Sequence, residues 1–277
     1  MMKDAVATPY VFDHAGCRLH YWLAGPPHRP LVVFTHGVTL DHRMFDAQVA
    51  ALAPEYRVLT WDVRGHGASQ PLDGDFSVRG AAGDLLALLD HLGYEQAILV
   101  GHSMGGYVSQ ELLFLHPERV TALVTIDTTC ITLKHPPVIA LGMRLTPLAF
   151  SLCPYAIVTW LAALATTVTP HVRAYVCEVM SRLSKKDFLT LWSAAMNCRH
   201  YEPGYRIAQP LLITHGEHDI LGFGLIWQQS KAWAARDSNA RYIVIPAAAH
   251  NANQENPAFF NTLLLEFLSR HVHGEDV

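Results

Sequence analysis

The chain has 277 residues, of which 51% are hydrophobic and 16% are charged, and its formal net charge is -4. This length and composition are typical of a globular protein with a substantial core, and they exclude the disordered and fibrous classes. The small net charge and the scattered Lys and Arg residues argue against nucleic acid as a partner.

The N-terminus and the cysteines give an expectation about the compartment. The first twenty residues contain Asp4, Asp13 and His14, and they lack the basic start and continuous apolar middle of a signal peptide. The five cysteines form no Cys-x-x-Cys pair, and their odd number does not suit a disulfide framework. We therefore expect reduced, buried thiols in a cytoplasmic protein.

Six short apolar runs predict strands that are buried on both faces. They span residues 31–35, 57–61, 97–100, 122–126, 211–214 and 242–245. Helical patterns at 83–92 and 257–268 place Leu and Phe residues on one broad apolar face. Alternating strands and helices predict an α/β protein with a doubly wound, mostly parallel sheet.

A segment from about residue 131 to residue 207 interrupts this alternation with helical patterns joined by prolines. We expect residues 1–130 and 208–277 to form the core, and residues 131–207 to form an inserted helical cap over the carboxyl edge of the sheet. Within the cap, residues 148–168 are apolar and uncharged over about the length of a membrane span. Pro154, several threonines and the mid-chain position favour a buried or pocket-lining helical pair, without stable membrane insertion.

The sharpest chemical signal is the sequence GHSMGG at residues 101–106, which follows a predicted strand and opens an amphipathic stretch. A serine on a tight strand-to-helix turn needs small residues two positions before and after it, because the backbone is strained and the helix packs closely. The turn would present Ser103 as a nucleophile above the sheet. The alternative is a glycine-rich turn in which Ser103 only caps a helix.

Activation of Ser103 requires a histidine as base and a carboxylate that orients the histidine. Among seventeen histidines, His250 lies in a loop between a predicted strand and the last helix, at the edge expected for Ser103. The other histidines near strand ends are expected to be structural, and no second ligand pair supports a metal site among them. These are His36, His66, His102, His215 and His218.

For the acid we favour Asp219, which ends the segment that leaves the predicted strand at 211–214. This choice gives the chain order Ser, Asp, His that is expected of such a fold. Asp127 directly follows another strand, and Glu217 is two residues from Asp219. Both remain alternatives for the same role.

Hydrolysis also requires N–H donors for the negative oxygen of the intermediate. Met104 supplies one donor at the start of the predicted helix. Val38 is expected to supply the second, because Gly37 lets the loop after the strand at 31–35 approach closely. The alternative is that His36 and Gly37 form only a turn that ends the strand.

Together these motifs resemble those of the α/β-hydrolase superfamily, and in particular the capped carboxylesterases and lactonases, in the group that includes cofactor-free haloperoxidases. The resemblance covers both flanks and leaves the cap unmatched. The motifs are HG at 36–37, DVRGHGAS at 62–69, the turn around Ser103, GEHD at 216–219, and His250 with Asn253, Glu255 and Pro257. Ala249 stands where many relatives have Gly, and relatives with an Asp nucleophile, such as haloalkane dehalogenases and epoxide hydrolases, are disfavoured by Ser103.

The residues and the resemblance predict hydrolysis of a carboxylic ester or lactone of an apolar small molecule through an acyl-serine. No metal or organic cofactor is required, and residues 62–69 are expected to support the site. The same triad also serves thioester hydrolysis, acyl transfer, carbon–carbon bond cleavage and perhydrolysis, because fold and triad do not specify the acyl group or its acceptor. A slow ligand-sensing protein is a further alternative.

Overall fold

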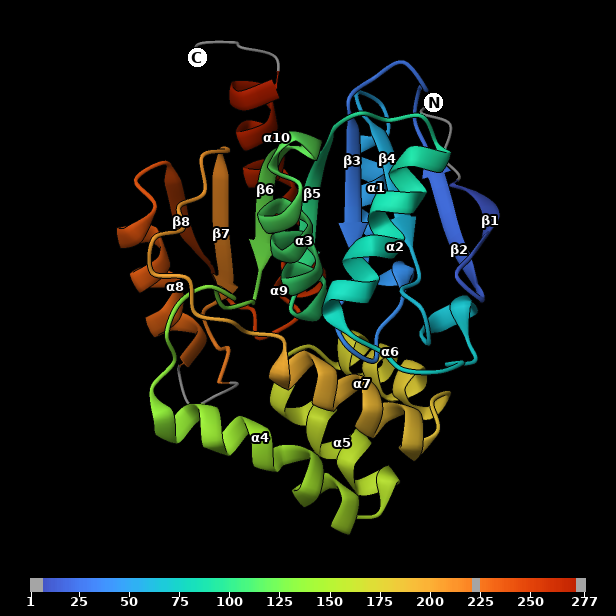
Figure 1. Cartoon of the computed structure of the whole chain (residues 1–277), viewed down its shortest axis with the longest axis vertical. Coiled ribbons are helices and arrows are strands. Elements are labelled where there is room, and N and C mark those ends of the chain that lie inside the picture. Colours follow the sequence, from blue (N-terminus) through green and yellow to red (C-terminus); the bar gives the residue numbers. More distant parts are fainter. Residues whose placement is uncertain (1–6, 221–224, 273–277) are drawn as a thin grey trace.

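The computed structural model describes residues 7–220 and 225–272, so the outermost residues of the expected core lie outside the described part. The described residues form one eight-stranded sheet in the order β1-β2-β4-β3-β5-β6-β7-β8 (Figure 1). The strands are β1 (Thr8–His14), β2 (Cys17–Ala24), β3 (Leu31–Thr35), β4 (Arg57–Trp61), β5 (Ala97–His102), β6 (Val120–Ile126), β7 (Leu211–Gly216) and β8 (Ala240–Ile245).

The sheet is mostly parallel, as the sequence predicts. Strands β3 to β8 pair in parallel, whereas β1 pairs with β2, and β2 with β4, in antiparallel register. The β1–β2 hairpin was not predicted. Its first strand is largely exposed and its second alternates between buried and half-buried positions, so neither contains the continuous apolar run that marks the central strands.

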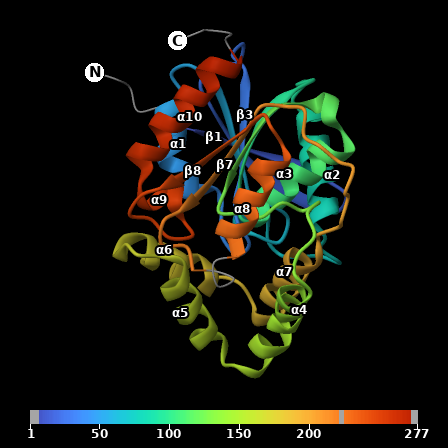
Figure 2. The same cartoon turned by 90° about the vertical axis from the view of Figure 1, so that its left-hand side faces the viewer.

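Helices cover both faces of the sheet (Figures 1 and 2). Side chains of α2, α3 and α8 share one apolar cluster with Leu31 and Val33, and side chains of α1 and α10 share the other with Val32 and Phe34. Successive residues of a strand point to opposite faces, which explains the alternation. The helices outside the insertion are α1 (Asp46–Leu52), α2 (Val78–His91), α3 (Met104–Leu115), α8 (Leu225–Arg236), α9 (Ala252–Glu255) and α10 (Pro257–Val272).

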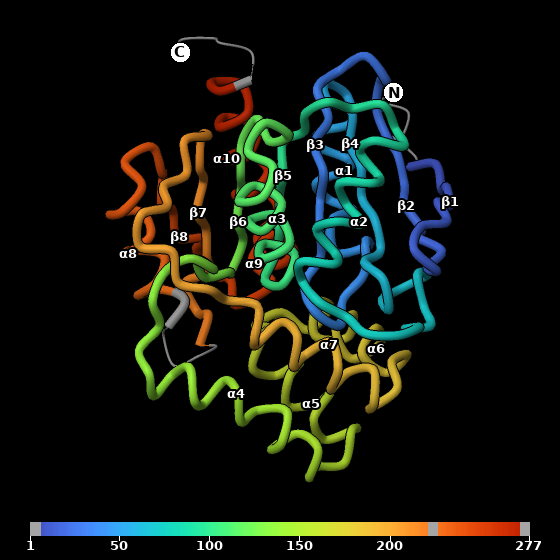
Figure 3. The backbone as a smooth tube through the Cα atoms, viewed as in Figure 1, coloured from blue at the N-terminus to red at the C-terminus, as the bar shows by residue number. Residues whose placement is uncertain are grey.

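The helical insertion lies between β6 and β7, at the end of the sheet where the parallel strands finish (Figures 1 and 3). It contains α4 (Pro137–Leu152), α5 (Tyr155–Thr166), α6 (Pro170–Ser181) and α7 (Lys185–Asn197). Helix α4 packs against α7, and α5 packs against α6, so that two helical pairs diverge from their common end (Figure 2).

Of the two expectations for this segment, a buried or a pocket-lining helical pair, the first does not agree with the observed burial. In α5 the buried residues are Val158, Thr159 and Ala163, but α4 has none. The large side chains Leu152 and Trp160 are 80% and 57% exposed. An apolar stripe in the sequence indicates that one face of a helix packs against other groups, but it does not identify those groups. In α4 and α5 many apolar side chains of the stripe are exposed. No helix among the described residues is both long and apolar enough to cross a membrane.

A polar cluster joins α6 to the loop that follows β3. The hydroxyl of Tyr175 donates to Asp41 Oδ1 at 3.0 Å, and Arg43 binds both oxygens of the same carboxylate. Arg43 also reaches Glu178 on α6 at 3.1 Å. The α5–α6 side of the insertion is thus attached to the core by buried or half-buried hydrogen bonds.

Candidate active site

Ser103 occupies the junction between β5 and α3 with a φ of +48°. Only close packing maintains such a backbone in a residue other than glycine. A Cβ added at Gly105 would lie 2.0 Å from the carbonyl oxygen of Thr35, and one at Gly101 would lie 2.4 Å from the carbonyl oxygen of Gly105. The glycines therefore let the helix approach the sheet closely enough to hold the serine in this turn.

The structure brings Ser103, His250 and Asp219 together in one hydrogen-bonded chain. Nε2 of His250 lies 3.1 Å from Oγ of Ser103, and Nδ1 lies 2.9 Å from Oδ2 of Asp219. The ionised carboxylate only accepts, so Nδ1 carries the proton and Nε2 is left to accept from the serine hydroxyl. The side chain of Asp219 is fully buried and that of His250 is 9% exposed.

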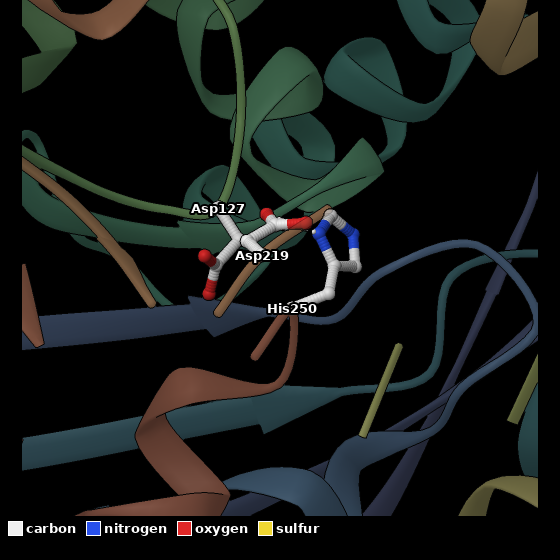
Figure 4. Close-up of side chains that lie close together, drawn as sticks. All are labelled: Asp127, Asp219 and His250. Atoms are coloured by element: carbon white, nitrogen blue, oxygen red, sulfur yellow. Dashed lines mark hydrogen bonds and ion pairs between the residues drawn. The ribbon is translucent and has the colours of Figure 1, made fainter. Parts of the chain in front are cut away.

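A second carboxylate, Asp127, lies beside Asp219 and His250 (Figure 4). Its Oδ1 accepts the N–H of Gly216 at 2.7 Å, and its Oδ2 accepts the N–H of Ala252 at 3.2 Å. Burial, reinforced by the neighbouring charge of Asp219, raises the pKa of Asp127 well above its usual range. The environment thus favours the neutral form of Asp127, whose carboxyl group is tied to the backbone of two loops.

Glu217, the other alternative acid, is placed differently. Its side chain is 54% exposed, and its Oε2 accepts the N–H of Ala247. Its exposed carboxylate contrasts with the buried one of Asp219.

One atom each of Asp127, Asp219 and His250 lies within 4.8 Å of the others, which is a spacing that a metal ion also uses. Hydrogen bonds already account for this cluster. Backbone N–H groups take both oxygens of Asp127, and His250 uses Nδ1 for Asp219. The donor set therefore fits a proton-transfer chain better than a cation site.

The loop after β3 touches the serine turn. A Cβ added at Gly37 would lie 3.3 Å from Cβ of Ser103 and 2.5 Å from Nδ1 of His102. At the other side of the turn, Met104 is the first residue of α3, so its N–H has no acceptor within the helix. Val38 and Met104 thus lie on two segments that meet at Ser103.

His36 sets the orientation of the peptide between Gly37 and Val38. Nε2 of His36 accepts the N–H of Val63 at 3.0 Å, so Nδ1 carries the proton and donates to the carbonyl of Gly37 at 2.8 Å. The carbonyl and the N–H of a trans peptide point in opposite directions. This bond therefore turns the N–H of Val38 away from the His36 ring.

The loop at 62–69 is attached through Asp62 to the segment that follows the His36–Val38 loop. Oδ1 of Asp62 accepts the N–H of His42 at 2.8 Å, and its Oδ2 accepts the N–H of Ala68 at 2.7 Å. Although burial acts against ionisation, hydrogen bonding and the charge of His42 lower the pKa of Asp62. A Cβ at Gly67 would lie 2.1 Å from Oδ2 of Asp62, which explains the glycine.

Neutral imidazoles surround the site. His36, His66 and His102 are buried, and burial lowers the pKa of each ring, to about 3 for His66 and His102. The ring centroids of His36 and His66 are 5.0 Å apart. Nε2 of His102 donates to the carbonyl of His250 at 2.7 Å. His102 thus fixes the backbone of the proposed base, a role that its position before Ser103 does not reveal in the sequence.

The sequence interpretation assigns no individual role to two more residues of the His250 loop. Asn251 donates to the carbonyl of Thr166 in the insertion at 3.0 Å, and Glu255 accepts N–H groups from Ala249 and from Thr169. Glu255 was noted only as part of a motif. Its position five residues after His250, at the end of the short helix α9, was the one available signal.

Comparisons with known proteins agree with this architecture. Residues 30–149 match the alpha/beta hydrolase fold family. The enol-lactonase of Burkholderia xenovorans LB400 superposes with a TM-score of 0.81 at 25% identity, covering 94% of this chain and all of that one. The chain is an α/β-hydrolase-fold protein. This result confirms the fold class and the resemblance inferred from the sequence.

Sequence relatives place the protein among hydrolases of this fold. It is 28% identical over 253 residues to the putative carbamate hydrolase RutD of Pseudomonas savastanoi, covering 87% of this chain and 94% of the relative. It is 36% identical to 3-oxoadipate enol-lactonase 2 of Acinetobacter baylyi over 110 residues, which are 40% of this chain and 41% of the relative. The hydrolase is thus related to proteins that are named for different substrates.

Proposed function

We propose that this hydrolase cleaves a carboxylic ester or lactone of an apolar small molecule through an acyl-serine intermediate. The observation that carries the proposal is the continuous hydrogen-bonded chain from Ser103 through His250 to Asp219. A serine becomes an effective nucleophile only when an oriented base accepts its proton, and this chain supplies both the base and its orientation.

The proposed reaction follows from the position of each group. Nε2 of His250 takes the proton of Ser103 while Oγ attacks the carbonyl carbon, and Asp219 stabilises the resulting imidazolium. The N–H groups of Val38 and Met104 are proposed to bind the oxyanion. The leaving alcohol takes the proton from His250, and water, deprotonated by the same nitrogen, then releases the acid and restores Ser103.

The division of the chain and its location complete the proposal. Residues 1–130 and 208–277 form the catalytic core, and residues 131–207 form the cap over the site. All five cysteines are free thiols, which fits a cytoplasmic protein, although only Cys130 is buried and the expectation of buried thiols is wrong for the other four.

The test is a fluorophosphonate probe with the variant Ser103→Ala. We expect the probe to label the wild-type protein at Ser103, and the variant to lose labelling and at least about a thousandfold in esterase activity. Ser109→Ala is the matched control, because Ser109 is also on α3 and its hydroxyl donates to the carbonyl of Gly105. It should keep both properties.

Two results would contradict the proposal. One is undiminished ester hydrolysis by a folded Ser103→Ala protein, which would remove Ser103 from the mechanism. The other is a single turnover that ends in a persistent adduct, which would favour a ligand-sensing protein over an enzyme. Repeated turnover of a simple chromogenic ester excludes that second reading.

A further inference from the structure

One carboxylate, Glu255, binds two parts of the molecule that are far apart in the sequence. Its Oε1 accepts the N–H groups of Val168 and Thr169, at 2.6 and 2.8 Å, and the hydroxyl of Thr169 at 3.1 Å. Its Oε2 accepts the N–H of Ala249 at 2.6 Å. Val168 and Thr169 form the turn between α5 and α6 of the insertion, whereas Ala249 directly precedes His250.

The residue that follows His250 is attached to the same turn. Nδ2 of Asn251 donates to the carbonyl of Thr166, the last residue of α5, at 3.0 Å. The proposed base therefore lies between two residues that are both connected to the α5–α6 turn, one through Glu255 and one directly.

We propose that Glu255 is a positioning residue that couples the α5–α6 turn of the insertion to the placement of His250. The proposal rests on the proposed function in one respect, namely that His250 is the base for Ser103. In this arrangement the insertion sets the position of the base, in addition to covering the substrate.

An ionised carboxylate is well suited to this position. It has acceptor sites on both oxygens, so it binds N–H groups on opposite sides without presenting a proton to either. Hydrogen bonds to an ionised group are shorter and stronger than those between neutral groups. Glutamine offers a single acceptor oxygen, so Glu255→Gln preserves the bonds to one side and places an NH2 group against an N–H on the other.

The decisive experiment is the kinetics of Glu255→Gln with a p-nitrophenyl ester. Displacing a catalytic group by about 1 Å costs on the order of a hundredfold in rate, so we expect kcat to fall about ten- to a hundredfold while KM changes less than about threefold. Fluorophosphonate labelling of Ser103 should slow in parallel. The acid limb of the kcat/KM profile should move to lower pH, because an imidazolium displaced from Asp219 is less stabilised.

Glu266→Gln is the matched control. Glu266→Gln is the same chemical change, but it lies on α10, where Glu266 pairs with Arg241 and Arg270 at the surface. It should retain wild-type kinetics. Asn251→Ala, which removes the second connection to the turn, should reduce kcat in the same direction as Glu255→Gln.

The outcomes separate this proposal from the proposed function. A wild-type protein that neither reacts with the probe nor hydrolyses esters would overturn both. If the wild type is active and folded Glu255→Gln has the same kcat and pH profile, only the coupling is overturned. This holds even if the variant melts at a lower temperature. Should Glu255→Gln fail to fold, Thr169→Val removes one donor from the insertion side, and wild-type kcat in both that variant and Asn251→Ala would overturn the coupling.

Discussion

Asp127 and Asp219 end up side by side because β6 and β7 are neighbouring parallel strands. Their partners give them different properties. Asp219 faces Nδ1 of His250, whereas Asp127 uses its oxygens for the backbone of Gly216 and Ala252, and burial favours its neutral form. At the residue scale, therefore, one carboxylate is placed to orient the base and the other to hold the loops around it.

This difference predicts unequal effects of two matched substitutions. Asp219→Asn leaves no acceptor charge for Nδ1–H and favours the wrong tautomer of His250, so kcat should fall by about 10⁴-fold. Asp127→Asn replaces a neutral group with a neutral group of the same shape, so kcat should fall by less than about tenfold, with some loss of stability. Steady-state kinetics of the two purified variants, after comparison of their unfolding midpoints, give the answer.

The ranking is the critical result. If Asp127→Asn were the more damaging of the two at equal stability, the acid of the triad would be the residue at the end of β6.

The sequence reveals some of these residues more readily than others. Ser103 is recognisable because a strained turn demands small neighbours, and the need for a base directs attention to His250. The choice among Asp127, Asp219 and Glu217 stayed open, because all three follow strand ends at one edge of the sheet. Glu255 and His102 act through backbone atoms of the His250 loop, and the spacing of Glu255 from His250 does not indicate which backbone atoms it binds.

At the scale of elements, the exposed apolar side chains of α4 and α5 predict a preference for acyl chains. Leu148 is 60% and Trp160 57% exposed, and the segment around them has no formal charge. If they contact the bound acyl chain, each methylene gains up to about 0.8 kcal/mol, or about fourfold in kcat/KM. We therefore expect kcat/KM to rise from p-nitrophenyl acetate to the butyrate and hexanoate until the pocket is full.

A steady decrease from acetate onward would show that these helices present no such surface to the substrate. Their apolar residues would then serve only the packing of α4 against α7 and of α5 against α6.

The sequence predicts most readily the elements whose residues are buried along their whole length. The central strands β3 to β7 are largely buried on both faces, so they appear as continuous apolar runs that the sequence predicts. The sixth predicted strand, β8, lies at the edge of the sheet and only Ile245 in it is buried, so the expectation of burial on both faces is wrong there. The β1–β2 hairpin lies at the edge of the sheet and is partly exposed, which weakens the pattern. The insertion was located by its prolines, but periodicity did not indicate that α4 lacks buried residues.

At the scale of the whole molecule, the site is assembled from segments separated by up to about half of the chain. Ser103 comes from the middle of the sheet, Asp219 and His250 come from loops after β7 and β8, and the insertion joins them through Glu255. The polar cluster around Asp41 and Tyr175 attaches the same side of the insertion to the loop after β3. The α5–α6 pair is therefore fixed to the core by polar bonds at two places.

The neutral imidazoles around the site have a consequence for folding itself. When the chain unfolds, the buried rings of His36, His66 and His102 regain pKa values near 6.5, so unfolding takes up protons below that pH. Each ring then lowers the free energy of unfolding by about 1.4 kcal/mol per pH unit as the pH falls from about 6.5 toward the folded-state pKa. Burial also lowers the pKa values of His135 and His215, which act in the same direction. The raised pKa values of Asp127 and Asp46 act in the opposite direction, but they are two groups against five.

Urea unfolding at about pH 7 and about pH 5 should therefore show a clear loss of stability at the lower pH, before most carboxylates titrate. The variant His66→Gln removes one of these rings, so its loss of stability between the two pH values should be smaller by about 2 kcal/mol. Equal losses for the two proteins would show that His66 takes up no proton on unfolding. The same burial that keeps these rings neutral beside the site thus makes the folded protein sensitive to mild acid.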